Sequence, residues 1–138
     1  MLLDTHVFIW IAVEPERVPT EVRSALKTAA ALFISPISLT EIIIKHHKNP
    51  AAFPFSPDHA HKALSALQLS VLDYTARHAQ YLAKLPEIHK DPFDRILFAQ
   101  ALAEGLPVVS TDDIIASYES EYESLEGSPL KLTIVRCR

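Results

Sequence analysis

The sequence predicts an α/β fold in which helices cover both faces of a parallel sheet. Short apolar segments recur along the 138 residues, and helical segments separate them. Alternation of this kind favours parallel strands with helices packed on each side. Hydrophobic residues make up 49% of the chain, which is enough for a sizeable core. Because neither an internal repeat nor a linker is visible, we expect a single domain over residues 1–138.

The expected strands are short and apolar. Four of them read as buried segments, and the last alternates apolar and polar residues as a half-exposed edge strand does. These strands are predicted at residues 1–3, 32–35, 69–72, 108–110 and 130–135.

Capping residues predict where the helices begin. Asp4 or Thr5 caps the first helix, and Thr20 and Thr75 cap two others. The run from Ser38 to Glu41 has the pattern of a capping box. The clearest helix opens at Asp91 and Pro92 and stops at Gly105. The predicted helices cover residues 5–13, 20–29, 38–49, 58–67, 75–85 and 91–104.

Charge and cysteine content limit the classes of function. The formal net charge is −4, so no bulk electrostatic attraction draws nucleic acid to the chain. Cys137 is the single cysteine and can form no internal disulfide, which fits a reducing cytoplasm. The N-terminus lacks the basic region of a signal peptide. Pro36 and Glu41 interrupt the most apolar stretch, so we expect no membrane span.

Four acidic residues stand where a strand has just ended or a helix is starting: Asp4, Glu41, Asp94 and Asp112. Each has an ordinary interpretation when taken alone. Asp4 and Asp112 suit helix or turn caps, and Glu41 suits a capping box with Ser38. Asp94 lies in the first turn of a helix, where the macrodipole favours a negative charge.

Together the four acids predict a metal site, because the carboxyl ends of parallel strands share one rim of the sheet. Carboxylates crowded at that rim repel one another unless a cation lies among them. Oxygen ligands of this kind suit Mg²⁺ or Mn²⁺. Such a site is typical of metal-assisted hydrolysis of phosphodiester bonds. Asp4, Asp94 and Asp112 are the leading candidate ligands, with Glu41 as a ligand or as the partner of a bound water.

The motifs around these acids resemble those of the PIN-domain ribonucleases, specifically the VapC-type toxins of bacterial type II toxin–antitoxin systems. The matching pieces agree in order and spacing from residue 1 to about residue 115. They are Met-Leu-Leu-Asp4-Thr-His, Ser38-Leu-Thr-Glu41-Ile, Asp91-Pro-Phe-Asp94-Arg, and Val-Val-Ser110-Thr-Asp112.

The resemblance implies a three-layer α/β/α sandwich with a parallel sheet of about five strands. It also implies that Asp4, Glu41, Asp94 and Asp112 bind Mg²⁺ or Mn²⁺, with the hydroxyl of Ser110 supporting the site. The implied activity is that of an endoribonuclease acting on tRNA or other structured RNA. The implied partners are a second copy of the chain and a cognate antitoxin that covers the site.

Two other interpretations stay open at this level. One is a related nuclease that cleaves DNA, or processes RNA, without an antitoxin. The other is a non-catalytic module whose acidic rim holds only a metal or a partner peptide. Arg95 could pair with a carboxylate or contact phosphate, and His6 is expected to be packed or solvent-facing. The basic segment 45–48 is either a favourable helix C-terminus or a contact for the RNA backbone.

Overall fold

The structure, a computed structural model, describes residues 1–85, 91–111 and 134–136. It is an α/β fold built around a parallel sheet, as the sequence predicts. Within these ranges, no helix combines the length and the apolar character that a bilayer crossing requires.

All pairings in the sheet are parallel, and the strand order is β3-β2-β1-β4-β5. Leu2 pairs with Val108 and Leu3 with Val109, so the residues that follow β1 and β4 leave the sheet side by side. The strands are β1 (Leu2–Leu3), β2 (Phe33–Ile34), β3 (Ser70–Val71), β4 (Val108–Ser110) and β5 (Ile134–Arg136). The expected edge strand is therefore present as β5, although residues 130–133 lie outside the described part of the chain.

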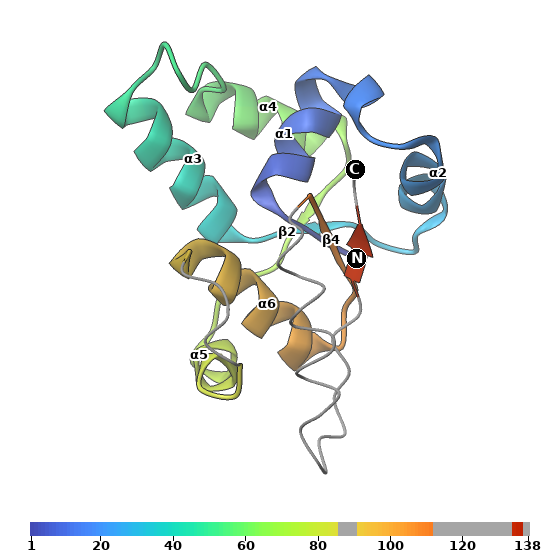
Figure 1. Ribbon diagram of the computed structural model, residues 1–138, viewed down its shortest axis with the longest axis vertical. Coiled ribbons are helices and arrows are strands. Elements are labelled where there is room, and N and C mark those ends of the chain that lie inside the picture. The colour runs from blue at the N-terminus through green and yellow to red at the C-terminus, as the bar shows by residue number, and fades with distance from the viewer. Residues whose placement is uncertain (86–90, 112–133, 137–138) are drawn as a thin grey trace.

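Helices connect the strands and lie on both faces of the sheet (Figure 1). Their positions follow the predicted order, with a short 3₁₀ turn, η1, at Pro15–Arg17. The α-helices are α1 (Thr5–Val13), α2 (Thr20–Thr28), α3 (Pro36–Lys48), α4 (Pro57–Ala66), α5 (Ala76–Leu82) and α6 (Pro92–Glu104).

Side-chain alternation along the strands divides the core into two layers. Leu3 and Val109 pack with α1, α2 and α4 on one face. Leu2 and Val108 pack with α6 on the other. Successive strand residues point to opposite faces, so even strands of two or three residues contribute to both layers. The three-layer arrangement expected from the resemblance is confirmed.

Helix α6 is the most deeply enclosed helix, as its nearly uniform apolar sequence predicts. Seven consecutive residues, 97–103, are buried. Helix α5 packs along it, and His78 and Arg77 both contact Glu104 at its C-terminal end.

Most of the predicted helix starts are confirmed, and two differ. Asp4, Thr75 and Asp91 cap α1, α5 and α6 through their side chains. Helix α2, however, has Pro19 rather than Thr20 at its N-cap position.

The capping box predicted from Ser38 to Glu41 is wrong. Helix α3 begins earlier, at Pro36, with Ser35 as its cap. Proline is well suited to the first helical position, because its fixed φ matches the helix and its missing N–H is not needed there. Ser38 and Glu41 therefore lie inside the helix, where their side chains are available for other contacts.

Gly105 ends α6 in a left-handed conformation with φ of 64°, and a Cβ added there would meet no atom within 4 Å. We expect Gly105→Ala to lower the free energy of unfolding by about 1 kcal/mol, through backbone strain alone. Urea denaturation measures this. Gly105→Asn is the matched control and should cost less, because asparagine tolerates this conformation. Equal stability of Gly105→Ala and the parent chain would contradict the prediction.

Candidate active site

Asp4 is the best-defined member of the predicted site. It follows β1 and caps α1, and only 4% of its surface is exposed. Its Oδ1 accepts a hydrogen bond from the backbone N–H of Val7 at 2.7 Å. Its Oδ2 accepts one from the Ser110 hydroxyl and one from the backbone N–H of Thr111 at 3.1 Å. Donors from the end of β4 and from the first turn of α1 therefore fix this carboxylate.

Burial raises the pKa of Asp4 above its usual value, because the ionised form loses its hydration. The hydrogen bonds from Ser110, Val7 and Thr111, and the nearby charge of His6, each act in the opposite direction. Burial is the larger effect. His6 itself is exposed, in agreement with the solvent-facing alternative predicted for it.

The position of Asp4 in the sheet is one where open α/β folds bind ligands. The chain builds outward from β1 to β2 and β3 on one side, and then adds β4 and β5 on the other. The strand order thus reverses between β1 and β4. A crevice opens beyond the carboxyl ends of the strands at such a reversal. Asp4 and Ser110 stand at the ends of these two strands.

A buried hydroxyl pair brings α3 to the same rim. The Thr5 hydroxyl donates to Ser38 Oγ at 3.0 Å, although 33 residues separate them. Both residues are buried. Glu41 is three residues after Ser38 and therefore lies on the same face of α3. The contact links the residue next to Asp4 with the helix face that carries Glu41.

Glu41 is buried, with 1% of its surface exposed, and its two oxygens differ. Oε2 forms an ion pair with Lys45 Nζ at 2.6 Å. Oε1 is buried and has no hydrogen-bond partner within the described residues. A buried carboxylate oxygen without a donor is unfavourable, so its position suits a bound cation or water.

The remaining predicted residues belong to the start of α6 and to the segment after β4. Asp94 lies in the first turn of α6 and is partly buried. Since α6 leads into the start of β4, its first turn faces the same rim as the strand ends. Arg95 is also partly buried, and its Nε has no hydrogen-bond partner among the described residues. Asp112 lies outside the described residues, directly after Thr111.

The donor set fits a hard cation in its chemistry. It consists of carboxylate oxygens. One is the unpartnered Oε1 of Glu41, and others belong to Asp4, whose pKa is raised by burial. Over residues 1–85, 91–111 and 134–136, however, no three His, Cys, Asp or Glu side chains form a group that could hold a metal. Asp4, Glu41 and Asp94 alone do not make a complete site in this conformation.

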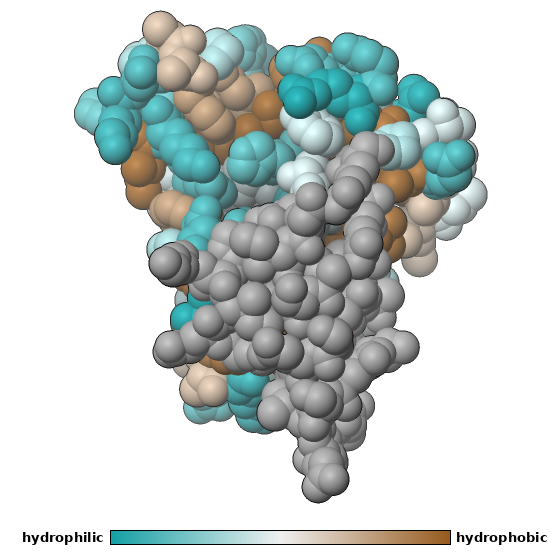
Figure 2. Space-filling view, in the orientation of Figure 1, coloured by the Kyte–Doolittle hydropathy of each residue, from teal (hydrophilic) through white to brown (hydrophobic). Residues whose placement is uncertain are grey.

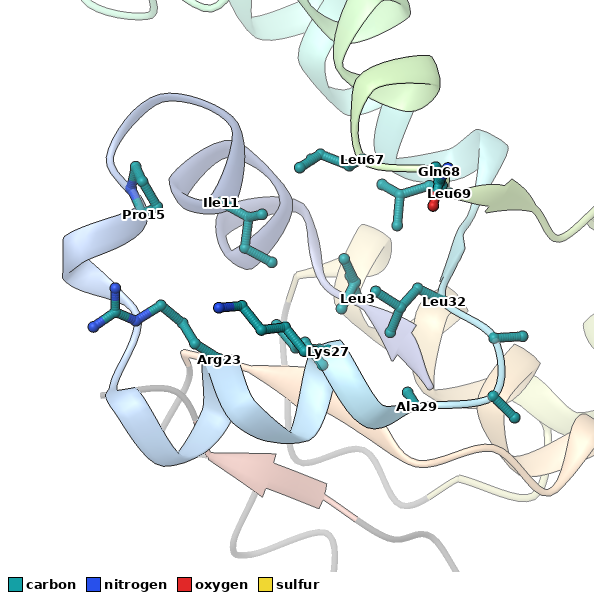
Figure 3. A pocket seen from close by; sticks show the side chains of 13 residues that line it. Leu3, Ile11, Pro15, Arg23, Lys27, Ala29, Leu32, Leu67, Gln68 and Leu69 are labelled. Carbon is teal, nitrogen blue, oxygen red and sulfur yellow. The ribbon is translucent and has the colours of Figure 1, made fainter.

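A cavity elsewhere in the structure contains none of the predicted site residues. It has a volume of about 500 Å³ and is bordered by α1, α2 and the segments before β2 and β3 (Figure 3). Those segments precede their strands, so the cavity opens at the rim opposite Asp4. Apart from Arg23, Lys27 and Gln68, the described residues that line it are apolar and include no acid or nucleophile.

One contact at the site has a weak signal in the sequence, and another has none. Lys45 follows Glu41 by four residues, a spacing that places oppositely charged side chains together on a helix. The sequence alone does not show that the carboxylate would be buried. The bond between Thr5 and Ser38 had no sequence signal, because it depends on how α1 and α3 pack.

We expect Ser110→Ala to raise the pKa of Asp4 further, because it removes a donor that favours the ionised form. A raised pKa in the folded state contributes stability that is present below the unfolded pKa and lost as pH rises through the folded value. The variant should therefore lose stability relative to the parent increasingly as pH rises, by about 1–3 kcal/mol at neutral pH.

Urea denaturation in EDTA from about pH 4.5 to pH 8 measures this difference in the free energy of unfolding. Ser110→Thr is the control, because it keeps a hydroxyl at the same position. A stability difference between Ser110→Ala and the parent that does not change with pH would show that the hydroxyl does not act on the Asp4 charge.

Known proteins with a similar sequence or fold agree on one family. The family model of the PIN domain matches residues 1–120 of this chain. By sequence the chain is similar to Ribonuclease VapC22 of Mycobacterium tuberculosis (strain ATCC 25618 / H37Rv), with 25% identity over 131 residues. The alignment covers 86% of this chain and 91% of that protein.

Solved structures of similar fold come from toxin–antitoxin complexes. VapBC-1 from nontypeable Haemophilus influenzae has a TM-score of 0.65 at 13% identity, over 98% of this chain and 96% of that one. VapBC2 from Rickettsia felis, bound to a promoter DNA fragment, has a TM-score of 0.64 at 15% identity, over 99% and 98%. At these identities the likeness is one of fold. The match over residues 1–120 contains all four predicted acids and confirms the expected family: the chain belongs to the PIN domain family.

Proposed function

We propose that this protein is a metal-dependent endoribonuclease of the VapC type, the toxin of a toxin–antitoxin pair. The observation that carries the proposal is the buried Asp4 carboxylate at the strand-order reversal, held by Ser110 and Thr111. Similarity to a VapC ribonuclease supports ribonuclease activity. Fold similarity to VapBC complexes supports a cognate antitoxin as partner.

Asp4, Glu41, Asp94 and Asp112 are the residues that would hold Mg²⁺ or Mn²⁺. When bound, such an ion supplies a water of lowered pKa and stabilises charge that develops on phosphate oxygens. Ser110 and Thr111 keep the Asp4 carboxylate in a fixed orientation. Oε1 of Glu41 is buried and has no hydrogen-bond partner among the described residues.

We propose tRNA or another structured RNA as the substrate. With a net charge of −4, the chain does not attract RNA through its overall charge. Attraction must come from the site and from local basic side chains. His47 and Lys48 are exposed at the end of α3, whereas His46 Nδ1 is bonded to the Phe53 carbonyl at 2.8 Å. Part of the basic segment therefore has a structural role.

We also propose a homodimer in which α3 takes part. Ile43 and Ile44 are each 50% exposed, which is unusual for two adjacent isoleucines on a helix. Figure 2 shows apolar surface among the polar side chains over α3 and α4. A second copy of the chain would cover such a surface.

We expect Asp94→Asn to abolish cleavage of RNA that depends on Mg²⁺ or Mn²⁺, with a rate loss of about 10²-fold or more, while the fold is retained. An amide cannot supply the negative charge that a divalent ion requires. Incubation of the pure protein with total RNA, with metal or with EDTA, followed by mapping of the cut ends, measures this.

Asp58→Asn is the matched control, because Asp58 also lies in the first turn of a helix, α4, and is exposed. It should cleave at the parental rate. Cleavage of single-stranded DNA but not RNA would favour the related nuclease without an antitoxin. Metal binding without cleavage of either nucleic acid would favour the non-catalytic module.

A further inference from the structure

The ion pair between Glu41 and Lys45 is not an ordinary helix-surface pair. Pairs at this spacing are usually exposed on both sides and contribute a few tenths of a kcal/mol. Here the Glu41 side chain is 2% exposed and that of Lys45 is 37% exposed, with 2.6 Å between Oε2 and Nζ. A buried carboxylate is therefore neutralised by an ammonium group that reaches it from the solvent side.

The Arg17–Glu14 pair shows the difference within the same chain. Its side chains are 51% and 49% exposed, and the closest atoms are 3.2 Å apart. Neither carboxylate burial nor an unpartnered buried oxygen accompanies it. At Glu41, in contrast, Oε1 is left without a donor within the described residues while Oε2 is bound to Lys45.

We propose that Lys45 is a built-in placeholder for the metal cation: its ammonium neutralises Glu41 when the site lacks a divalent ion, and it competes with that ion for the carboxylate. This rests on the proposed function, since it assumes that Glu41 serves a metal site. A buried carboxylate needs hydrogen-bond donors or a positive charge to compensate it, and among the described residues Lys45 is the partner that Glu41 has. Lys45 provides that charge and can withdraw, because its ammonium lies close to solvent.

The proposal assigns opposite effects to Lys45 in the two states. Without metal, removing the ammonium leaves a buried carboxylate uncompensated and lowers Tm. With metal, the ammonium is a nearby positive charge that weakens binding of the ion, so its removal should tighten binding. A residue that only clamps Glu41 in position for the metal would act in the same direction in both states.

The test is Lys45→Met, followed by thermal unfolding in EDTA and in saturating Mn²⁺, and by a Mn²⁺ titration that detects the free ion by electron paramagnetic resonance. We expect Tm to fall by about 5 °C in EDTA. We expect this loss to disappear in Mn²⁺, because an ion that binds the folded state stabilises it by mass action. The apparent Kd for Mn²⁺ should fall about tenfold.

Lys48→Met is the matched control, because it removes the same charge from the same helix turn at an exposed position. It should leave the difference between Tm in EDTA and Tm in Mn²⁺ as it is in the parent chain. It should change the apparent Kd for Mn²⁺ by no more than about twofold. If Lys45→Met is too unstable to study in EDTA, the double variant Glu41→Gln with Lys45→Met should recover stability, because it removes the uncompensated charge as well.

Equal loss of Tm in EDTA and Mn²⁺, or weaker binding of Mn²⁺ by Lys45→Met, would overturn the placeholder role. These outcomes differ from failure of the proposed function. If the parent chain itself gains no stability from Mn²⁺ and Mg²⁺, the metal site is absent and both proposals fail. If the parent binds Mn²⁺ and Lys45→Met binds it no more tightly, the placeholder alone is refuted.

Discussion

The site depends on keeping one carboxylate, that of Asp4, inside the protein. Burial disfavours its charge, and the surrounding chain offsets this with donors from Val7, Ser110 and Thr111. The donors of Ser110 and Thr111 are in place only when β1 and β4 pair in their observed register, and that of Val7 only when α1 begins after Asp4. Sheet register, the start of α1 and the orientation of Asp4 are therefore one coupled arrangement. The offset is incomplete, since the pKa of Asp4 stays raised.

Asp4 and Glu41 are both buried carboxylates, and different kinds of contact stabilise them. Asp4 is held by neutral donors from the end of β4 and from the first turn of α1. Glu41 is held by a single charged side chain on its own helix. The first arrangement fixes the geometry of the carboxylate, and the second leaves it dependent on one side chain that is partly exposed to solvent.

Much of the fold could be predicted from local sequence, because local signals decide it. Asp91 is predicted as a helix cap, Asp4 as one of two candidate caps with Thr5, and Gly105 as a helix end, from their own types and neighbours. The start of α3 was misplaced because two capping patterns overlap, and Ser35 with Pro36 prevailed over Ser38 with Glu41. Pro36 favours the earlier start, because its fixed φ suits the first helical position and its missing N–H is not needed there.

The site could be predicted only in part, because its defining contacts join distant segments. The sequence identified Asp4, Glu41 and Ser110, but not the bond between Thr5 and Ser38 that relates them. That bond also explains why the shift in the start of α3 matters. Were α3 to begin at Ser38, the hydroxyl would be used as a cap and would not be free to receive Thr5. By starting at Pro36, the helix releases Ser38 to fix the spacing of α1 and α3, and with it the position of Glu41 relative to Asp4.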